Sequence, residues 1–353
     1  MLDFGLEDSA LGHLTSLVQF GFIAGTLLFA ILLLADRYLP SRVFFICALF
    51  GALSNLALVV EGNSFFTLAV LRFATGFFLA GIYPVGMKIA SDYYNKGLGK
   101  SLGLLVSALV LGTAFPHFLK ITIGSVSWHM VIITTSLIAT FGGVLLLIFV
   151  PKGPHYKSIS NFDMSAFYKV FQYKKFRKAA YGYFGHMWEL YAFWAFIPLI
   201  ISSYNVQHDN LLNVSLWSFL VIAAGTISCA VSGFISLKYG PKKVAVFALS
   251  LSGICCLLSP LIFQVENTFI FALFILIWGM SVIADSPMLS TLVAKNAPSD
   301  FKGTALTIVN CLGFSITILS IQLLTYISNF SNHNFIYLIL ALGPMFGLYK
   351  LKK

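Results

Sequence analysis

The sequence predicts an all-helical membrane protein with about eleven transmembrane helices, built from two related halves. Three observations lead to this fold class. The 353 residues are 59% hydrophobic and only 10% charged, whereas soluble domains are about 25% charged. Long apolar segments recur along the whole chain, separated by short polar connections. A charged turn between two of these segments occurs a second time in the later part of the chain.

The apolar segments are long enough for helices that cross the hydrocarbon of a bilayer, which takes about 20 residues. They cover residues 12–35, 44–60, 65–91, 101–122, 127–150, 180–204, 212–236, 244–263, 268–294, 303–327 and 334–349. All but three of the 22 Lys and Arg residues lie in alternate connections or at the C-terminus. This positive-inside bias predicts a multi-pass protein with a cytoplasmic C-terminus, and it explains the net charge of +10 without nucleic acid as a partner.

The sequence contains no motif of an enzyme or of a metal site. The five cysteines lie in apolar segments and lack the spacing of metal ligands. No P-loop is present, so ATP is not the direct driver, and no His-Glu-x-x-His motif occurs. We therefore expect no catalysis, no metal and no cofactor. The expected partners are the lipid bilayer and a small-molecule or ion substrate, and we expect a monomer.

The longest connection, residues 151–179, is the expected domain boundary. It begins with Pro-Lys-Gly-Pro, which ends the preceding helix. Aromatic and aliphatic residues then alternate with polar ones before a basic cluster, as in an amphipathic helix on the inner membrane face. We predict an N-terminal bundle over residues 1–150, a cytoplasmic linker over 151–179 and a C-terminal six-helix bundle over 180–353.

The charged turn indicates an internal duplication. Residues 36–43 read Asp-Arg-Tyr-Leu-Pro-Ser-Arg-Val, and residues 237–244 read Leu-Lys-Tyr-Gly-Pro-Lys-Lys-Val. The first turn follows the first apolar segment, whereas the second turn follows the second segment after the linker. The first half should therefore lack its first helix. We expect a truncated or mis-started chain, with a genuine eleven-span protein as the alternative.

The turn resembles the hallmark loop of the major facilitator superfamily, Gly-x-x-x-Asp-Arg-x-Gly-Arg-Arg. Asp36, Arg37 and Arg42 match it, while Leu32 and Leu39 replace both glycines. The resemblance implies two six-helix bundles that alternate in access, with the turn bracing them in the outward-open state. The gating candidates are Asp36, Arg37, Arg42, Lys238, Lys242 and Lys243.

Two further stretches carry the same resemblance. Arg72 to Gly76 matches the Arg-x-x-x-Gly of the family's fourth helix. Residues 81–86, Gly-Ile-Tyr-Pro-Val-Gly, are similar to prokaryotic members, which predicts the bacterial inner membrane. Arg72 lies within an apolar segment, so it either binds an anionic substrate or a coupled carboxylate, or forms a structural ion pair.

Ionisable and amide groups within other spans are further candidates for substrate binding or coupling. His186 and Glu189 share one helical face, which predicts a proton relay. The alternative is that Glu189 only fixes helix packing. Asp285 precedes Ser-Pro in a span, and a helix kinked by this proline suits a gate or a polar binding site. The alternative is that Asp285 pairs with Lys295 or with a neighbouring helix. Asn310 contacts either the substrate or another helix. We interpret Lys88 and Asp92 as an i, i+4 pair at the membrane interface, near the inner end of their helix.

These features predict a secondary active transporter of a small solute, a symporter or antiporter coupled to protons or to exchange. Arg72 favours a small organic or inorganic anion. The alternatives are a proton-coupled drug exporter and a truncated, non-functional transporter fragment. A membrane enzyme would need a clustered catalytic site that the sequence does not contain.

Overall fold

The structure is a computed structural model that describes residues 9–122, 127–157, 166–328 and 333–352. Within these ranges all regular elements are α-helices or short 3₁₀-helices, and no strand occurs. An α-helix pairs its backbone donors and acceptors within its own segment, which is what hydrocarbon requires. The structure therefore confirms the predicted fold class, an all-α membrane protein.

Nine helical segments of the described residues are long and apolar enough to cross a membrane. They are Pro40–Val59, Phe65–Tyr93, Leu98–Leu119, Trp128–Phe149, Lys174–His208, Val214–Tyr239, Pro241–Ile262, Thr268–Asn296 and Ser299–Ser328. The two other expected spans, 12–35 and 334–349, coincide with shorter or interrupted helices. Residues Ser16–Ile31 form a shorter apolar helix, and a 3₁₀ segment interrupts the last span.

The chain divides into two compact units, and each draws on separate parts of the sequence. Unit 1 comprises Met1–Asn95, Ser125–Tyr173 and Ala297–Phe314. Its described helices are α1 (Ser9–Ile31), α2 (Leu34–Arg37), α3 (Pro40–Leu56), η2 (Ala57–Val59), α4 (Phe65–Leu79), α5 (Tyr83–Tyr93), α7 (Trp128–Phe149), α8 (Ala166–Lys169), η3 (Val170–Gln172), η4 (Ser299–Phe301) and the first part of α14 (Lys302–Ser328).

Unit 2 comprises Lys96–Gly124, Lys174–Asn296 and Ser315–Lys353. Its described helices are α6 (Leu98–Thr122), α9 (Lys174–His208), α10 (Val214–Tyr239), α11 (Pro241–Ile262), α12 (Thr268–Ala284), α13 (Ser286–Asn296), the rest of α14, α15 (His333–Ile336), η5 (Tyr337–Ala341) and α16 (Leu342–Lys352). In this grouping α6 packs with α10, and the start of α14 packs with unit 1, while the bundles predicted on either side of the linker stay a prediction.

The linker is only partly described. Residues 158–165 of the expected amphipathic helix lie outside the described residues. After them come the short helices α8 and η3, and then α9 begins at Lys174. The basic residues of the linker's end therefore belong to the first turn of α9, a 35-residue helix, instead of a separate surface helix.

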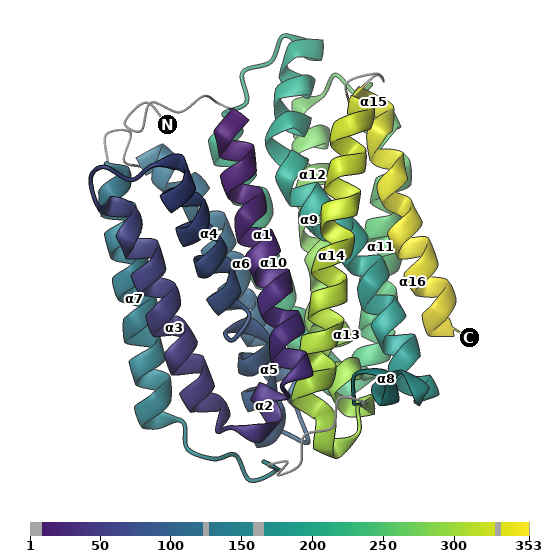
Figure 1. Cartoon of the computed structure of the whole chain (residues 1–353). Coiled ribbons are helices and arrows are strands. Elements are labelled where there is room, and N and C mark those ends of the chain that lie inside the picture. The colour runs from purple at the N-terminus through teal and green to yellow at the C-terminus, as the bar shows by residue number, and fades with distance from the viewer. Residues whose placement is uncertain (1–8, 123–126, 158–165, 329–332, 353) are drawn as a thin grey trace. The chain divides into compact units, whose positions relative to one another are not determined.

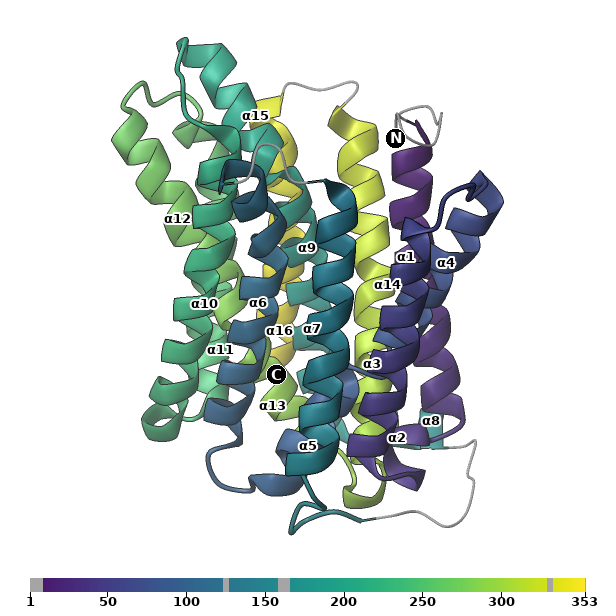
Figure 2. The same ribbon diagram turned by 90° about the vertical axis from the view of Figure 1, so that its left-hand side faces the viewer.

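Within unit 1, α1 packs closely on α4, and α3 packs on α7 and α4 (Figure 1). Glycines make the first contact possible, because a Cβ atom at Gly21, Gly25 or Gly76 would collide with backbone of the facing helix. The Gly-x-x-x-Gly of α1 is thus a packing surface. Figure 2 shows α3 and α7 side by side along their length.

Within unit 2, α9 runs along α16 and α13, and α10 packs on both α6 and α12 (Figures 1 and 2). The span 268–294 breaks at Asp285, between α12 and α13, just before Pro287. The corresponding span of unit 1 breaks between α4 and α5, just before Pro84. A proline in a helix interior removes one backbone hydrogen bond, so both repeats are interrupted at the same place.

In both charged turns a proline starts the next helix. Pro40 is the first residue of α3, and Pro241 is the first residue of α11. The missing N–H of proline costs nothing at this position, and its fixed φ suits the helix. The second turn uses Gly240 with φ of 81°, whereas Leu39 at the equivalent position of the first turn has φ of −61°. Three residues before the first turn, Leu33 lies in the left-handed region at φ of 57°. A leucine with this conformation is rare and locally strained.

Candidate functional site

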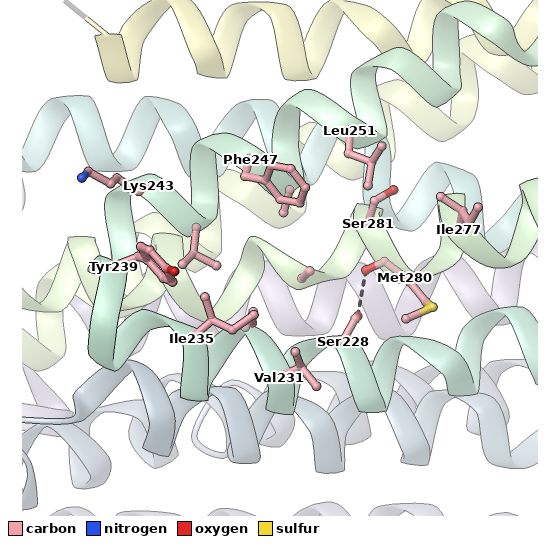
Figure 3. A pocket seen from close by; sticks show the side chains of 14 residues that line it. Ser228, Val231, Ile235, Tyr239, Lys243, Phe247, Leu251, Ile277, Met280 and Ser281 are labelled. Carbon is pink, nitrogen blue, oxygen red and sulfur yellow. Dashed lines mark hydrogen bonds between the residues drawn. The ribbon is translucent and has the colours of Figure 1, made fainter.

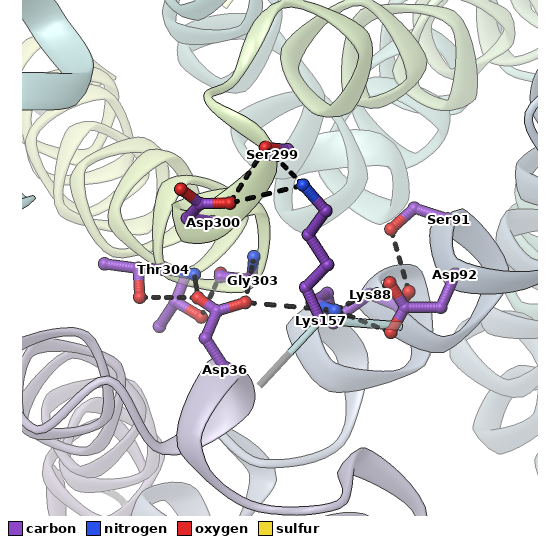
Figure 4. A network of polar contacts seen from close by, with 10 residues as sticks. Asp36, Lys88, Ser91, Asp92, Lys157, Ser299, Asp300, Gly303 and Thr304 are labelled. Atoms are coloured by element: carbon purple, nitrogen blue, oxygen red, sulfur yellow. Dashed lines mark hydrogen bonds and ion pairs between the residues drawn. The ribbon is translucent and has the colours of Figure 1, made fainter. Parts of the chain in front are cut away.

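The Asp36 carboxylate binds the beginning of α14 (Figure 4). One oxygen accepts a hydrogen bond from the backbone N–H of Gly303 at 2.9 Å. The other accepts from the backbone N–H and the hydroxyl of Thr304, at 2.6 and 2.7 Å. The first N–H groups of a helix have no partner inside the helix and carry a partial positive charge. A buried carboxylate from a distant part of the chain satisfies them here.

Lys88 extends this contact to α5. Its amine lies 3.9 Å from Asp36 and donates to both oxygens of Asp92, at 2.6 and 2.5 Å (Figure 4). Lys88 is only 2% exposed, and the ring of Tyr156 lies 5.2 Å from its amine. The expected i, i+4 pair of Lys88 and Asp92 is therefore present, and it is buried and linked to Asp36.

The same network reaches the segment after α7. The backbone N–H of His155 donates to the carbonyl oxygen of Asp92 at 2.9 Å. Lys157 lies 3.6 Å from Asp300 and donates to Ser299 at 3.2 Å, at the exposed edge of the network (Figure 4). Burial raises the pKa of the Asp36 carboxyl, opposed by Lys88 and by the hydrogen bonds from Thr304 and Gly303. This carboxylate consequently binds a proton more readily than it would in water.

The second turn repeats the packing of the first but lacks its acid. Asp36 meets the start of α14 at Gly303, and Ser236 packs against Gly99 at the start of α6. Residues 99–102 and 303–306 are equivalent in the two halves, so each turn meets the same part of the repeat. Leu237 replaces the aspartate, lies near Gly97 and is 57% exposed. Among the described residues, no carboxylate caps α6 as Asp36 caps α14.

A second group of buried polar residues lies in unit 2, centred on Glu189 of α9. Its two oxygens accept hydrogen bonds from Ser252 at 2.9 Å, Cys256 at 3.1 Å and Trp278 at 2.9 Å. The donors come from α11 and α12, and Glu189 is 1% exposed. A carboxylate with three donors has most of its hydrogen-bonding capacity satisfied. Glu189 thereby joins three helices of this unit.

His186 lies one turn before Glu189 and contacts a different acid. Its Nδ1 lies 2.8 Å from an Asp285 oxygen, and the two side chains are 1% and 0% exposed. The described residues show no hydrogen bond from His186 to Glu189, so the two acids of this unit have separate partners. The other ring nitrogen of His186 and the other oxygen of Asp285 have no hydrogen-bond partner within the same ranges. Asp285 also occupies the break between α12 and α13.

The other two predicted substrate candidates belong to unit 1. Arg72 on α4 is half-buried, and no ion pair or hydrogen bond to it occurs within the described residues. Asn310 on α14 is buried, and its amide donates to the carbonyl oxygen of Leu306 at 2.8 Å. The structure therefore leaves Arg72 as a cation in an apolar span, and it ties one amide donor of Asn310 to its own helix.

The remaining gating candidates are the basic residues of the two turns, and Arg37 among them is half-buried. Arg37 lies 5.9 Å from the ring of Tyr38, and Lys238 lies 5.3 Å from the ring of Tyr239. Arg42, Lys242 and Lys243 are exposed. Lys88, from α5, approaches Asp36 to 3.9 Å. Sequence reasoning missed this link, although a lysine inside an apolar span is a signal for a buried partner.

The fold and these buried groups define a polytopic integral membrane protein with ionisable side chains in its spans. The sequence matches the family model of the Major Facilitator Superfamily over residues 1–321. The chain therefore belongs to the major facilitator superfamily. A search of the curated proteins found no match.

Solved transporter structures share this fold. The human organic anion transporter MFSD10 (TETRAN) superposes with a TM-score of 0.79 at 16% identity, over 96% of this chain and 83% of that chain. A variant of the E. coli fucose:proton symporter FucP superposes with a TM-score of 0.75 at 13% identity, over 99% of this chain and 92% of that chain. A bacterial homologue of the iron transporter ferroportin, in its outward-facing state, superposes with a TM-score of 0.74 at 13% identity, over 99% of this chain and 91% of that chain. These likenesses show a common fold with transporters.

Proposed function

We propose that the chain is a secondary active transporter that moves a small solute by alternating access of two helical bundles, coupled to protons or to exchange. The observation that carries this proposal is the contact between His186 and Asp285, buried between spans of unit 2. Ionisable groups inside a membrane are costly and mark substrate or proton pathways. Histidine is also the side chain whose ordinary pKa lies closest to physiological pH.

The geometry of this pair suits a coupling site. The free ring nitrogen of His186 and the free oxygen of Asp285 give the pair unused donor and acceptor capacity among the described residues. Unpaired polar atoms in a buried place are costly unless water, a proton or a substrate meets them. The position of Asp285 at the helix break adds freedom to move when the pair changes its protonation. Glu189, with three donors, serves mainly to hold α9 on α11 and α12.

We propose a small organic or inorganic anion as the substrate class. Arg72 is the supporting residue, because it is a half-buried guanidinium in an apolar span with no anionic partner among the described residues. A guanidinium binds carboxylate or phosphate through two parallel hydrogen bonds. The similar human structure is that of an organic anion transporter, which agrees with this proposal.

We further propose that the protein lies in the bacterial inner membrane as a monomer. Its C-terminus is then cytoplasmic, because the basic residues lie in alternate connections and at that end. We assign the bundles to residues 1–150 and 180–353, joined by 151–179. The Asp36 network, in which Asp36 contacts Gly303, Thr304 and Lys88, then acts as a lock: it keeps the protein closed on the side of the basic turns. Release of Gly303 and Thr304 from Asp36 would accompany opening of that side.

Transport by purified protein tests the proposal. Proteoliposomes with an imposed pH gradient are screened with labelled carboxylates, inorganic anions and amphipathic drugs. We expect uptake or exchange of an anion that depends on the gradient or on a counter-solute. Flux of cationic drugs alone would favour the exporter alternative, and the absence of flux with any solute under any gradient would refute the transporter proposal.

Single substitutions then separate coupling from binding. His186→Gln and Asp285→Asn should abolish the dependence of transport on the pH gradient, whereas His155→Gln, at an exposed histidine, should leave it unchanged. Arg72→Gln should weaken anion binding about 10- to 100-fold, the loss expected of a charge-assisted hydrogen bond. Arg72→Lys keeps the charge without the two-pronged geometry and should restore part of the affinity.

A further inference from the structure

Unit 2 contains a cavity of about 610 Å³ between α10, α11 and α12 (Figure 3). Aliphatic and aromatic side chains form most of its wall, among them Ile235, Phe247 and Ile277. Several of these are exposed, Phe247 at 69% and Ile235 at 43%, so the cavity opens to the surroundings of the helices. In a membrane protein, the surroundings of apolar spans are lipid chains. His186, Glu189 and Asp285 do not line this cavity.

The serines of the cavity wall offer no free hydroxyl hydrogens. Ser228 donates to the carbonyl oxygen of Met280 at 2.8 Å, as Figure 3 shows. Ser232 donates to Cys229 at 2.9 Å, and Ser281 donates to Trp278 at 3.0 Å. Each hydroxyl is thus used by backbone carbonyls of the helices. The wall therefore favours an apolar chain over a polar solute, which would lose its own hydrogen bonds to water there.

One end of the cavity carries a cation. Lys243 and Tyr239 lie at this end, and Leu251 and Ile277 lie toward the other (Figure 3). Lys242 and Lys238 belong to the same turn, and residues 237–244 contain no acidic residue. A basic cluster next to a membrane span attracts anionic lipid headgroups, at about 1 kcal/mol per Lys or Arg. Charge at one end and apolar surface along the rest match an amphipathic anion.

The length of the cavity matches one leaflet. Along α11 it extends from Lys243 to Leu251, which at 1.5 Å per residue is about 12 Å. The hydrocarbon of one leaflet is about 15 Å thick, half of the bilayer core. A single acyl chain whose headgroup lies at the level of Lys243 would therefore fill the cavity to its inner end.

We propose that this cavity is a binding site for an anionic phospholipid of the leaflet next to the basic turn. One acyl chain lies between α10, α11 and α12, and the phosphate binds the Lys243 amine. The site does not include the proposed coupling residues His186 and Asp285, and the proposal holds whatever solute is carried. It gives the turn at 237–244, which lacks the acid of the first turn, a role in binding the lipid phosphate.

Native mass spectrometry of the purified full chain tests this site. Delipidated protein in detergent is titrated with phosphatidylglycerol and with phosphatidylcholine of identical acyl chains. We expect one phosphatidylglycerol to bind at least tenfold more tightly than phosphatidylcholine. Lys243→Gln should reduce phosphatidylglycerol binding to the level of phosphatidylcholine. Val231→Trp, which fills the cavity from α10, should weaken both lipids at least tenfold.

Matched variants provide the controls. Lys242→Gln removes a neighbouring exposed charge that does not line the cavity, and Leu257→Trp adds the same ring to an exposed position of α11 outside it. Both should bind phosphatidylglycerol as the wild type does, and thermal unfolding of every variant in the same detergent checks its folding. Equal binding of the two lipids by the wild type, or unchanged binding by Val231→Trp, would overturn the proposal. Displacement of the lipid by sn-glycerol phosphate would instead indicate a site for free organic phosphate and would also overturn it.

Discussion

Asp36 is the residue on which the buried network of unit 1 depends, since it joins the first charged turn to the start of α14. Asp36→Asn retains the size of the side chain but presents an amide N–H₂ to groups that are themselves donors. We expect the contact to weaken by about 1–3 kcal/mol, the cost of a buried donor left without a partner. Transport in proteoliposomes should fall several-fold or more. A wild-type rate for this variant would show that the contact has no part in the transport cycle.

A variant with a smaller change distinguishes loss of the contact between Asp36 and α14 from a general loss of stability. Thr304→Val removes the one hydrogen bond from the threonine hydroxyl, at 2.7 Å, and leaves both backbone N–H groups bound to Asp36. Its effect on transport should have the same sign as that of Asp36→Asn and be smaller. Thermal unfolding of both variants separates lost stability from a change in the balance of conformations.

The sequence predicted which residues carry charge into the membrane, but not their partners. Asp36, His186, Glu189 and Asp285 stood out because a charged side chain in or next to an apolar segment is rare. Helical spacing placed His186 and Glu189 on one face, and both are buried in unit 2. Spacing along one helix cannot tell which distant helix supplies a partner. His186 therefore contacts Asp285, and Glu189 binds Ser252 and Trp278, neither of which has a charge that would mark it in the sequence.

At the scale of the helix, close packing of α1 on α4 depends on glycine. A Cβ atom at Gly76 would collide with the carbonyl oxygen of Val18, and backbone cannot move aside as a flexible side chain can. Gly76→Ala should therefore destabilise the protein by about 1–3 kcal/mol, as over-packing does elsewhere. Thermal unfolding in detergent would show this as a lower midpoint.

Gly142 on α7 is the matched control in the same unit. A Cβ atom there meets nothing within 4 Å. Alanine has the better helix propensity, so Gly142→Ala should be neutral or stabilise by up to about 1 kcal/mol. An equal loss of stability in both variants would mean that the effect is not steric contact with α1.

The second charged turn predicts a gain of stability. Leu237 occupies the place of Asp36 in the repeat, is exposed and lies near the start of α6. Leu237→Asp would place a negative charge beside the N-terminus of that helix, which is worth about 0.3–1 kcal/mol. We expect a small rise in the unfolding midpoint at low salt that shrinks as salt is added. Leu237→Asn, which lacks the charge, should show no such dependence on salt.

The helices themselves were predictable because length and apolar composition determine them locally. All eleven expected segments coincide with described helices, and the proline at each helix break was visible in the sequence. The grouping of the helices was not predictable in the same way. Gly103 and Gly233 allow α6 to approach α10 at backbone contact, and the sequence has no local signal that pairs these two helices. Contacts between helices that are far apart in the sequence depend on surfaces that meet only after folding.

At the scale of the whole molecule, α14 takes part in both compact units, because the division falls between Phe314 and Ser315. Its start is held in unit 1 by Asp36 and, at the exposed edge, by the contact of Lys157 with Ser299 and Asp300. A transport cycle that opens the side of the basic turns must release this end of α14. A covalent tie at the exposed edge should therefore stop the cycle without altering any buried residue.

The tie is made with Lys157→Cys and Ser299→Cys, joined by a short bis-methanethiosulfonate reagent whose disulfides a reductant cleaves. The five native cysteines are buried and should not react. We expect transport to fall at least tenfold on cross-linking and to recover when reductant is added, while each single-cysteine variant keeps its rate after the same treatment. Transport at full rate by quantitatively cross-linked protein would mean that the start of α14 and the segment after α7 stay together throughout the cycle, and that the Asp36 network is a fixed part of the fold and not a lock.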